Sequence, residues 1–146
     1  HYSRYGQTIE DALVDLQRKV DDDNDDQTDA NKRLRLDTKK ALASARRIRE
    51  AGARLEQTLP TSARSQVNDA LVAAEEDFLA PDGLKGRPWY RHLIYAPGYD
   101  TGYEAVIFPE PAQAVKEKNQ ADLDAGMRRL EAALDKAAGR LEAIAR

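Results

Sequence analysis

His92, which follows Arg91, is the residue whose type most directly suggests catalysis in this sequence. An imidazole can ligate zinc or act as a general base. Either role needs further ligands or a proton partner, yet the only other histidine is the terminal His1, and cysteine is absent. We therefore predict no catalytic residue and no metal ligand in this chain, and we expect His92 to make structural hydrogen bonds.

The acidic run DDDNDD at 21–26 could in principle bind calcium. Alternating Asp and Asn side chains are how an EF-hand loop begins. With Asp21 at the first position, however, the required Gly falls on Asp26 and the bidentate Glu falls on Lys32. If the loop begins at Asp22 or Asp23 instead, the last position is Arg33 or Leu34, and neither has a carboxylate. We interpret the run as a solvated loop between helices, whose negative charge favours the N-terminus of the next helix.

The aromatic residues gather in one stretch, Pro81–Pro111, with the sequence PDGLKGRPWYRHLIYAPGYDTGYEAVIFPEP. It contains all prolines except Pro60, the only Trp and four of the six Tyr. Long irregular segments inside a compact domain are usually functional or disordered. This one has too many large apolar side chains for disorder. We therefore expect an ordered crossing segment that carries the function.

Composition limits the class of protein. A length of 146 residues corresponds to one domain, 1–146, and the charged fraction of 34% with only 6% aromatics is typical of helices. The net charge of −3 gives no basic field for nucleic acid, and no apolar run reaches the roughly 18 residues of a membrane span. We expect no nucleic-acid or membrane contact by this segment. Because the first residue is His1 and not Met, we expect a fragment of a longer protein.

Hydrophobic periodicity predicts helices on both sides of the crossing segment. The expected ranges are Tyr2–Val20, about Asp29–Leu59, about Ser62–Leu79 and, starting near Pro111 or Asn119, the remainder of the chain. Pro60-Thr61-Ser62 breaks the second helix and caps the third. Gly6 weakens the first helix by roughly 1 kcal/mol relative to Ala.

The last helix has the most regular pattern. Its apolar positions, spaced alternately four and three residues apart, are Leu123, Met127, Leu130, Leu134, Ala137, Leu141 and Ile144. Such a seam needs a partner helix. We predict an all-α fold: an antiparallel four-helix bundle with a long ordered crossing between helices three and four. Short strand pairing is expected around Leu93–Tyr95, and Trp89 and Tyr90 are expected to wedge between helices.

Part of the crossing resembles a known family. Residues 87–97 read RPWYRHLIYAP. They match the pattern Arg-Pro-aromatic-Tyr-Arg-His-hydrophobic-Ile-Tyr-Ala-Pro of the transferrin-receptor-like dimerisation domain. That domain is the C-terminal helical domain of zinc peptidases of the glutamate carboxypeptidase II (N-acetylated-alpha-linked acidic dipeptidase) type. Tyr103 and Phe108-Pro109 follow at the family's spacing, and the order of helices agrees along essentially the whole chain.

The resemblance implies a parent enzyme with a protease domain that holds two zinc ions, an inserted apical domain, and this domain packed against both. It implies that this domain forms most of a homodimer interface. It implies that the segment Ala96–Pro109 closes the substrate pocket, with Tyr103 donating its hydroxyl to the terminal carboxylate of the substrate. Arg87, Arg91 and Tyr95 would support that segment. Family members are commonly exported, periplasmic or membrane-anchored and extracellular.

The sequence departs from the family at Gly102. The glutamate-specific mammalian enzyme has a Lys there, which meets the side-chain carboxylate of glutamate. Gly102 offers no such group, and no other cation lies within Gly98–Glu110. We therefore expect the parent enzyme to lack a strong preference for a C-terminal glutamate.

Two other functions remain open from the residues alone. One is a free-standing helical-bundle interaction module without an enzymatic parent. The other is a receptor-type homologue whose protease domain has lost its metals and its peptidase activity. Under each of these readings, as under the peptidase reading, this chain alone is not an enzyme.

Overall fold

The structure is a computed structural model that describes residues 2–58, 64–99 and 104–145. The elements in these residues are α1 (Tyr2–Asp26), the 3-10 helix η1 (Ala30–Lys32), α2 (Lys39–Thr58), α3 (Arg64–Glu76), β1 (Tyr95–Pro97), β2 (Ala105–Ile107), α4 (Pro109–Glu117) and α5 (Gln120–Ile144). The prediction of a mainly helical fold is confirmed. The strands add one small antiparallel sheet, in which Ala96 lies opposite Val106.

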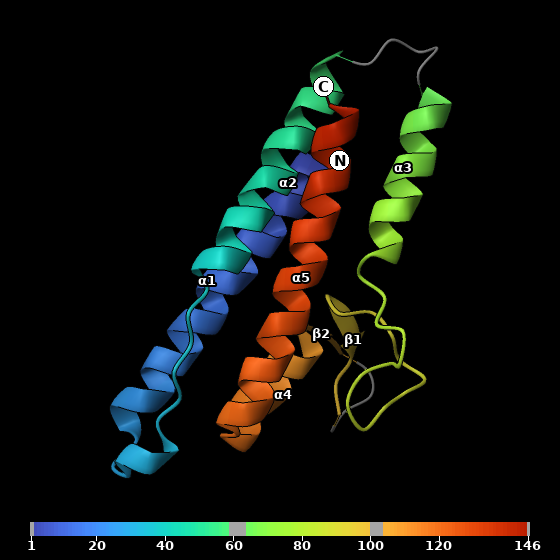
Figure 1. Cartoon of the computed structure of the whole chain (residues 1–146). Helices are drawn as coiled ribbons and strands as arrows, with labels where there is room; N and C mark the ends of the chain where they lie inside the picture. The colour runs from blue at the N-terminus through green and yellow to red at the C-terminus, as the bar shows by residue number, and fades with distance from the viewer. Residues whose placement is uncertain (1, 59–63, 100–103, 146) are drawn as a thin grey trace.

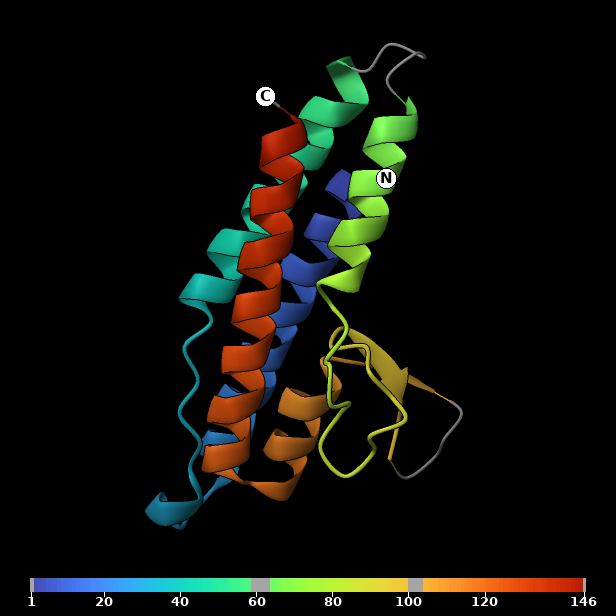
Figure 2. The same cartoon turned by 45° about the vertical axis from the view of Figure 1, so that its right-hand side comes forward.

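α2, α3 and α4 pack against α5, and α1 packs against α2. Figure 1 and Figure 2 show α1 and α2 beside each other, with α5 between α2 and α3 and the short α4 against the first half of α5. α2 and α5 run in the same direction (Figure 1). Gln120 at the start of α5 bonds the backbone of Arg35 just before α2, and Arg47 farther along α2 pairs with Asp135 farther along α5. The antiparallel four-helix bundle is therefore not confirmed, because two adjacent long helices are parallel and a fifth helix is present.

The periodic seam of α5 forms the centre of the core. All of its predicted positions from Leu123 to Leu141 are buried, and Ile144 at the end of the helix is partly buried. Burying a Leu side chain contributes about 2 kcal/mol. α5 begins where Asn119 accepts a hydrogen bond from the backbone N–H of Asp122, the usual role of an N-cap residue. The sequence predicts that the last helix starts near Pro111 or near Asn119. A helix begins near each of these residues, since α4 starts at Pro109 and α5 follows Asn119.

The acidic run is helical, so its prediction as a loop is wrong. α1 continues through Asp26 because side chains one turn apart support it. Lys19 pairs with Asp23 at 2.6 Å and Gln17 donates to Asp21 at 3.0 Å. Such pairs four residues apart stabilise a helix by a few tenths of a kcal/mol each. The exposed carboxylates also remain in water, which avoids a desolvation cost.

The predicted start of the second helix at Asp29 is also wrong. Asp29 caps only the short 3-10 helix, and Arg33 is already extended, with φ −69° and ψ 134°. Asn24 then fixes Leu34 by two hydrogen bonds of 2.8 Å, one to its N–H and one to its carbonyl. Leu34 is buried by this arrangement. α2 therefore begins at Lys39, ten residues later than expected. The predicted break at Pro60-Thr61-Ser62 lies outside the described residues.

Gly6 has a packing role that helix propensity does not reveal. It is buried where α1 crosses α2, and a Cβ atom added to it would lie 2.5 Å from the backbone nitrogen of Arg49. Gly52 on α2 meets the backbone of Ser3 in the same way. Beside this crossing, the buried Glu10 pairs with Arg49 at 2.7 Å. The two glycines let the helix backbones approach closely.

Candidate functional site

The crossing segment begins as a closed loop after α3. Its two sides are joined by backbone hydrogen bonds, from the N–H of Ala80 to the carbonyl of Arg91 (2.7 Å) and from the N–H of Leu93 to the carbonyl of Phe78 (2.8 Å). Inside this loop, the N–H of Leu84 donates to the carbonyl of Tyr90 at 2.7 Å. The segment is therefore ordered by its own backbone, as expected.

Gly83 allows the loop to close. Its φ is +77°, a left-handed conformation, and a Cβ atom there would lie 2.2 Å from the carbonyl oxygen of Pro88. No L side chain fits in that space. The close approach brings the Arg87–Pro97 stretch back against the end of α3.

Arg87 is the central side chain of this region. It is buried, its guanidinium lies 3.8 Å from the ring centroid of Tyr99 and 5.2 Å from that of Tyr90, and its Nη1 donates to the carbonyl of Pro97. A guanidinium over an aromatic face is held by the ring quadrupole. Arg87 thus ties the start of the crossing to β1.

His92 has structural contacts. Its Nδ1 accepts hydrogen bonds from the backbone N–H groups of Ile94 and Tyr95, each at 3.2 Å, so its ring proton is on Nε2. Nε2 faces the Glu75 carboxylate at 3.8 Å, and the ring lies about 6 Å from the rings of Phe78 and Tyr95. With Nδ1 used to hold the backbone, this imidazole is not arranged as a general base.

The predicted wedge of Trp89 between helices is wrong. Its side chain is 71% exposed, whereas Tyr90 beside it is half-buried. The loop turns Trp89 outward because Arg87 and Tyr90 fill the inner positions. Arg91 is exposed and donates from Nε to the carbonyl of Ala80 at 3.1 Å, so it holds the loop.

The small sheet lies where pairing was expected, slightly later than Leu93–Tyr95. Tyr95 lies opposite Ile107, and the N–H of Gly98 donates to the carbonyl of Glu104 at 2.9 Å. The residues between these two strands include Gly102 and Tyr103, which lie outside the described residues. The paired strands β1 and β2 fix the positions of Tyr99 and Glu104, the described residues on either side of this stretch.

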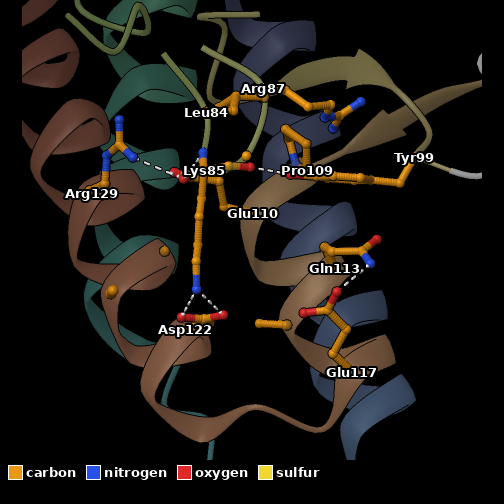
Figure 3. Close-up of a pocket in the computed structure, with 14 residues that line it drawn as sticks. Leu84, Lys85, Arg87, Tyr99, Pro109, Glu110, Gln113, Glu117, Asp122 and Arg129 are labelled. Atoms are coloured by element: carbon orange, nitrogen blue, oxygen red, sulfur yellow. Dashed lines mark hydrogen bonds and ion pairs between the residues drawn. The ribbon is translucent and has the colours of Figure 1, made fainter. Parts of the chain in front are cut away.

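Beside the crossing, a cavity of about 430 Å³ lies between the turn at 84–87, α4 and α5. Figure 3 shows Tyr99 along one side of it and Asp122 and Glu117 on the other. The Tyr99 hydroxyl donates to the carbonyl of Lys85, and the Lys85 ammonium contacts both oxygens of Asp122 at 2.6 and 2.5 Å. The hydrogen bond to Asp122 raises the pKa of Lys85.

Glu110 and Arg129 hold the inner wall of this cavity. The Glu110 carboxylate is largely buried and accepts from Arg129 at 2.8 Å and from the N–H of Lys85 at 3.1 Å. Arg129 also donates to the carbonyl of Gly83. The sequence prediction missed Lys85, Tyr99, Glu110 and Arg129. The only available signal was that Lys85, Tyr99 and Glu110 lie within the Pro81–Pro111 stretch. Arg129 carried no such signal, because it reaches the cavity from α5.

Within residues 2–58, 64–99 and 104–145, no group of three or more His, Cys, Asp or Glu residues could hold a metal ion. In the same ranges, no helix is long and apolar enough to cross a membrane.

The relatives with curated descriptions are named as peptidases. This chain is 44% identical over 52 residues to the probable glutamate carboxypeptidase VP8 of Zea mays, which covers 36% of this chain and 7% of that protein. It is 29% identical over 80 residues to the probable glutamate carboxypeptidase AMP1 of Arabidopsis thaliana, covering 55% of this chain and 11% of the relative. Each alignment thus spans only a small part of the relative's length.

A family model described as the transferrin receptor-like dimerisation domain matches residues 22–142. The match confirms the resemblance found in the Arg87–Pro97 stretch. It covers α2, α3, α4 and nearly all of α5, but only the end of α1, from Asp22 to Asp26. Since most of the chain is covered, this chain belongs to the transferrin receptor-like dimerisation domain family.

Proposed function

We propose that this chain is the homodimerising and pocket-closing domain of a glutamate carboxypeptidase-like zinc peptidase, and that it is not catalytic alone. The observation that carries the proposal is the family match over residues 22–142 together with relatives named glutamate carboxypeptidases. The contacts of His92, which serve the backbone, agree with chemistry that takes place in another domain.

The crossing segment is suited to closing a pocket because it is held rigidly from both sides. Arg87 binds β1 through Pro97, and the N–H of Phe108 donates to the carbonyl of Ile94 at 2.8 Å. The hairpin therefore has a fixed base. In the proposed parent, Tyr103 donates its hydroxyl to the terminal carboxylate of the substrate, which a phenol can do without bringing a full charge.

The metal chemistry is assigned to the rest of the parent. By the family resemblance, the two proposed zinc ions would be held by the protease domain. Zinc supplies a Lewis acid and an activated water. The role of this chain is to bind and orient the end of the substrate and to limit access of water.

The proposed partners are a second copy of the parent and the protease and apical domains of the same parent. Support comes from the family match and from Tyr95 and Ile107, which lie opposite each other on the small sheet and are both exposed. Apolar surface of this kind commonly marks interfaces. By the same family resemblance, we place the parent outside the cytoplasm, as an exported, periplasmic or membrane-anchored extracellular protein.

The test uses the full-length protein that contains this chain. We expect two zinc ions per protomer by elemental analysis, a dimeric mass by light scattering, and hydrolysis of peptides with a free C-terminal carboxylate. Metal-free and inactive dimers would instead favour the receptor-type homologue. A gene without a protease domain upstream of His1 would favour the free-standing module.

Replacing Tyr103 by Phe in that protein should raise KM about tenfold for peptides with a free C-terminal carboxylate. A hydrogen bond to a charged group is worth roughly 1.5–3 kcal/mol, and the lower end of this range corresponds to a tenfold change. Tyr2→Phe, which removes a hydroxyl at the start of α1, outside the crossing segment, is the matched control and should leave KM unchanged. Equal KM values for Tyr103→Phe and the parent would contradict the carboxylate contact.

Replacing Gly102 by Lys should create a preference for C-terminal glutamate. The new ammonium would pair with the side-chain carboxylate, which Gly102 cannot do. The ratio of kcat/KM for a C-terminal Glu peptide to that for a C-terminal Leu peptide should rise about tenfold. Ala105→Lys places the same charge on the exposed start of β2 and should not change the ratio. If both variants behave alike, Gly102 does not lie beside the substrate side chain.

A further inference from the structure

The cavity beside the crossing has the form of a small-molecule site. Its volume of about 430 Å³ lies within the range of roughly 300–1,000 Å³ usual for ligand pockets. Apolar wall is supplied by Leu84 from the turn, by Pro109 and Ala114 from α4, and by Gly126 from α5, all of them buried. Three separate parts of the chain thus enclose one apolar space.

The frame of the cavity is fixed by hydrogen bonds that do not involve a ligand. Tyr99 is tethered through its hydroxyl to the Lys85 carbonyl and is stacked by the Arg87 guanidinium. The Glu110 carboxylate joins Arg129 to the Lys85 backbone. A ligand would therefore enter a site that already has its shape, which lowers the entropic cost of binding.

Charge is unevenly distributed around this space. Figure 3 shows the Asp122 and Glu117 carboxylates together on the side away from Tyr99. Asp122 is paired with the Lys85 ammonium, whereas Glu117 accepts from the neutral amide of Gln113 at 2.9 Å. The charged side chains of the whole lining balance: Arg129 pairs with Glu110, and the Arg87 guanidinium lies at the Tyr99 side. The side with Asp122, Glu117 and the Lys85 ammonium therefore has a formal charge of −1 within a lining that is neutral overall. An apolar space with one negative end complements a ligand with an apolar body and a cationic end.

We propose that this cavity binds a small amphipathic cation of the arylalkyl-ammonium class. Its ring lies against Leu84, Pro109 and Ala114, and its ammonium is shared between Glu117 and Asp122. The Lys85 side chain is 69% exposed, and its own ammonium already occupies Asp122, so Lys85 competes with the ligand for that carboxylate. The proposal rests on the described residues that line the cavity and not on the proposed substrate contact of Tyr103.

The probe is tryptamine, titrated into the chain while backbone amide signals are followed by two-dimensional NMR. We expect saturable shifts at cavity residues such as Gln113 and Ala125, with a Kd of about 1 mM, as fragment-sized ligands of this atom count usually show. Indole-3-propionate has the same ring with a carboxylate, and it should bind at least tenfold more weakly. Non-saturating shifts, or tighter binding of the carboxylate, would overturn the proposal.

Three variants of the cavity and one control variant test where tryptamine binds, because their expected effects on the Kd differ. Ala125→Leu fills the cavity and should abolish binding, whereas Ala43→Leu, on the exposed face of α2, should not change the Kd. Lys85→Met removes the competing ammonium and should tighten binding about fivefold. Glu117→Gln should weaken it about threefold, the effect of one screened ion pair.

Lys85 and Glu117 have exposed side chains, so their variants are expected to fold as the parent does, and circular dichroism checks this for all four proteins. Unchanged binding by Ala125→Leu would show that tryptamine binds elsewhere. Weaker binding by Lys85→Met would show that the ammonium of Lys85 assists the ligand instead of competing with it. Either result contradicts the proposed arrangement.

Discussion

Replacing Gly6 by Ala is expected to destabilise the chain by about 2 kcal/mol, even though Ala is the better helix former. The new Cβ would lie 2.5 Å from the backbone nitrogen and 2.7 Å from the Cα of Arg49. Since these are backbone atoms, α1 and α2 would have to separate to admit it. Overpacking costs roughly 1–3 kcal/mol or more, and the gain in helix propensity, about 1 kcal/mol, offsets only part of this.

Gly139 on α5 provides the matched control. A Cβ atom added there meets nothing within 4 Å, so Gly139→Ala should stabilise the chain by about 1 kcal/mol through helix propensity alone. Urea unfolding followed by circular dichroism measures both changes. If Gly6→Ala raised the midpoint as Gly139→Ala does, the close crossing of α1 and α2 would be incorrect.

Replacing Arg87 by Ala is expected to cost about 3 kcal/mol of unfolding free energy. The change empties a buried site, leaves the Pro97 carbonyl without its donor, and removes the contact with Tyr99 at 3.8 Å. Removing a large buried side chain usually costs 2–5 kcal/mol. The Nε of Arg87 is buried without a hydrogen-bond partner in the described residues. Its desolvation therefore reduces the stabilisation that the Arg87 side chain provides.

Two further variants separate charge from shape. Arg87→Lys keeps the charge but loses the planar group that stacks on the ring, and should recover less than half of the loss. Arg128→Ala, an exposed arginine on α5, should change the stability by less than about 0.5 kcal/mol. Urea midpoints and hydrogen exchange at Gly98 report these effects. An Arg87→Ala protein as stable as the parent would show that Arg87 does not join the crossing to β1.

The parts of the fold that the sequence predicts are those set by local rules. The α5 seam is confirmed because its apolar spacing alone identifies the buried face, from Leu123 to Leu141. The described part of the crossing is ordered as expected, but through backbone hydrogen bonds and the buried Leu84, Ile94 and Phe108, whereas most of its aromatic side chains are exposed. The family was recognisable from Arg87–Pro97 because a specific order of residue types, and not a periodicity, carries that information.

The parts that failed depend on contacts between distant residues. The late start of α2 follows from the hydrogen bonds between Asn24 and Leu34, ten positions apart. The outward position of Trp89 follows from the packing of Arg87 between Tyr90 and Tyr99. The cavity wall at Arg129 is contributed by a helix more than forty residues after the turn it contacts, at Gly83. Periodicity and propensity contain none of these relations.

The exposed position of Trp89 has a practical consequence. It is the only Trp of the sequence, and the crossing presents its indole to water. The tryptophan fluorescence of the chain therefore arises from one known point on the surface proposed to face the neighbouring domains. Indole emission moves to shorter wavelength when water is excluded, so the emission maximum of this residue reports directly whether that surface is covered.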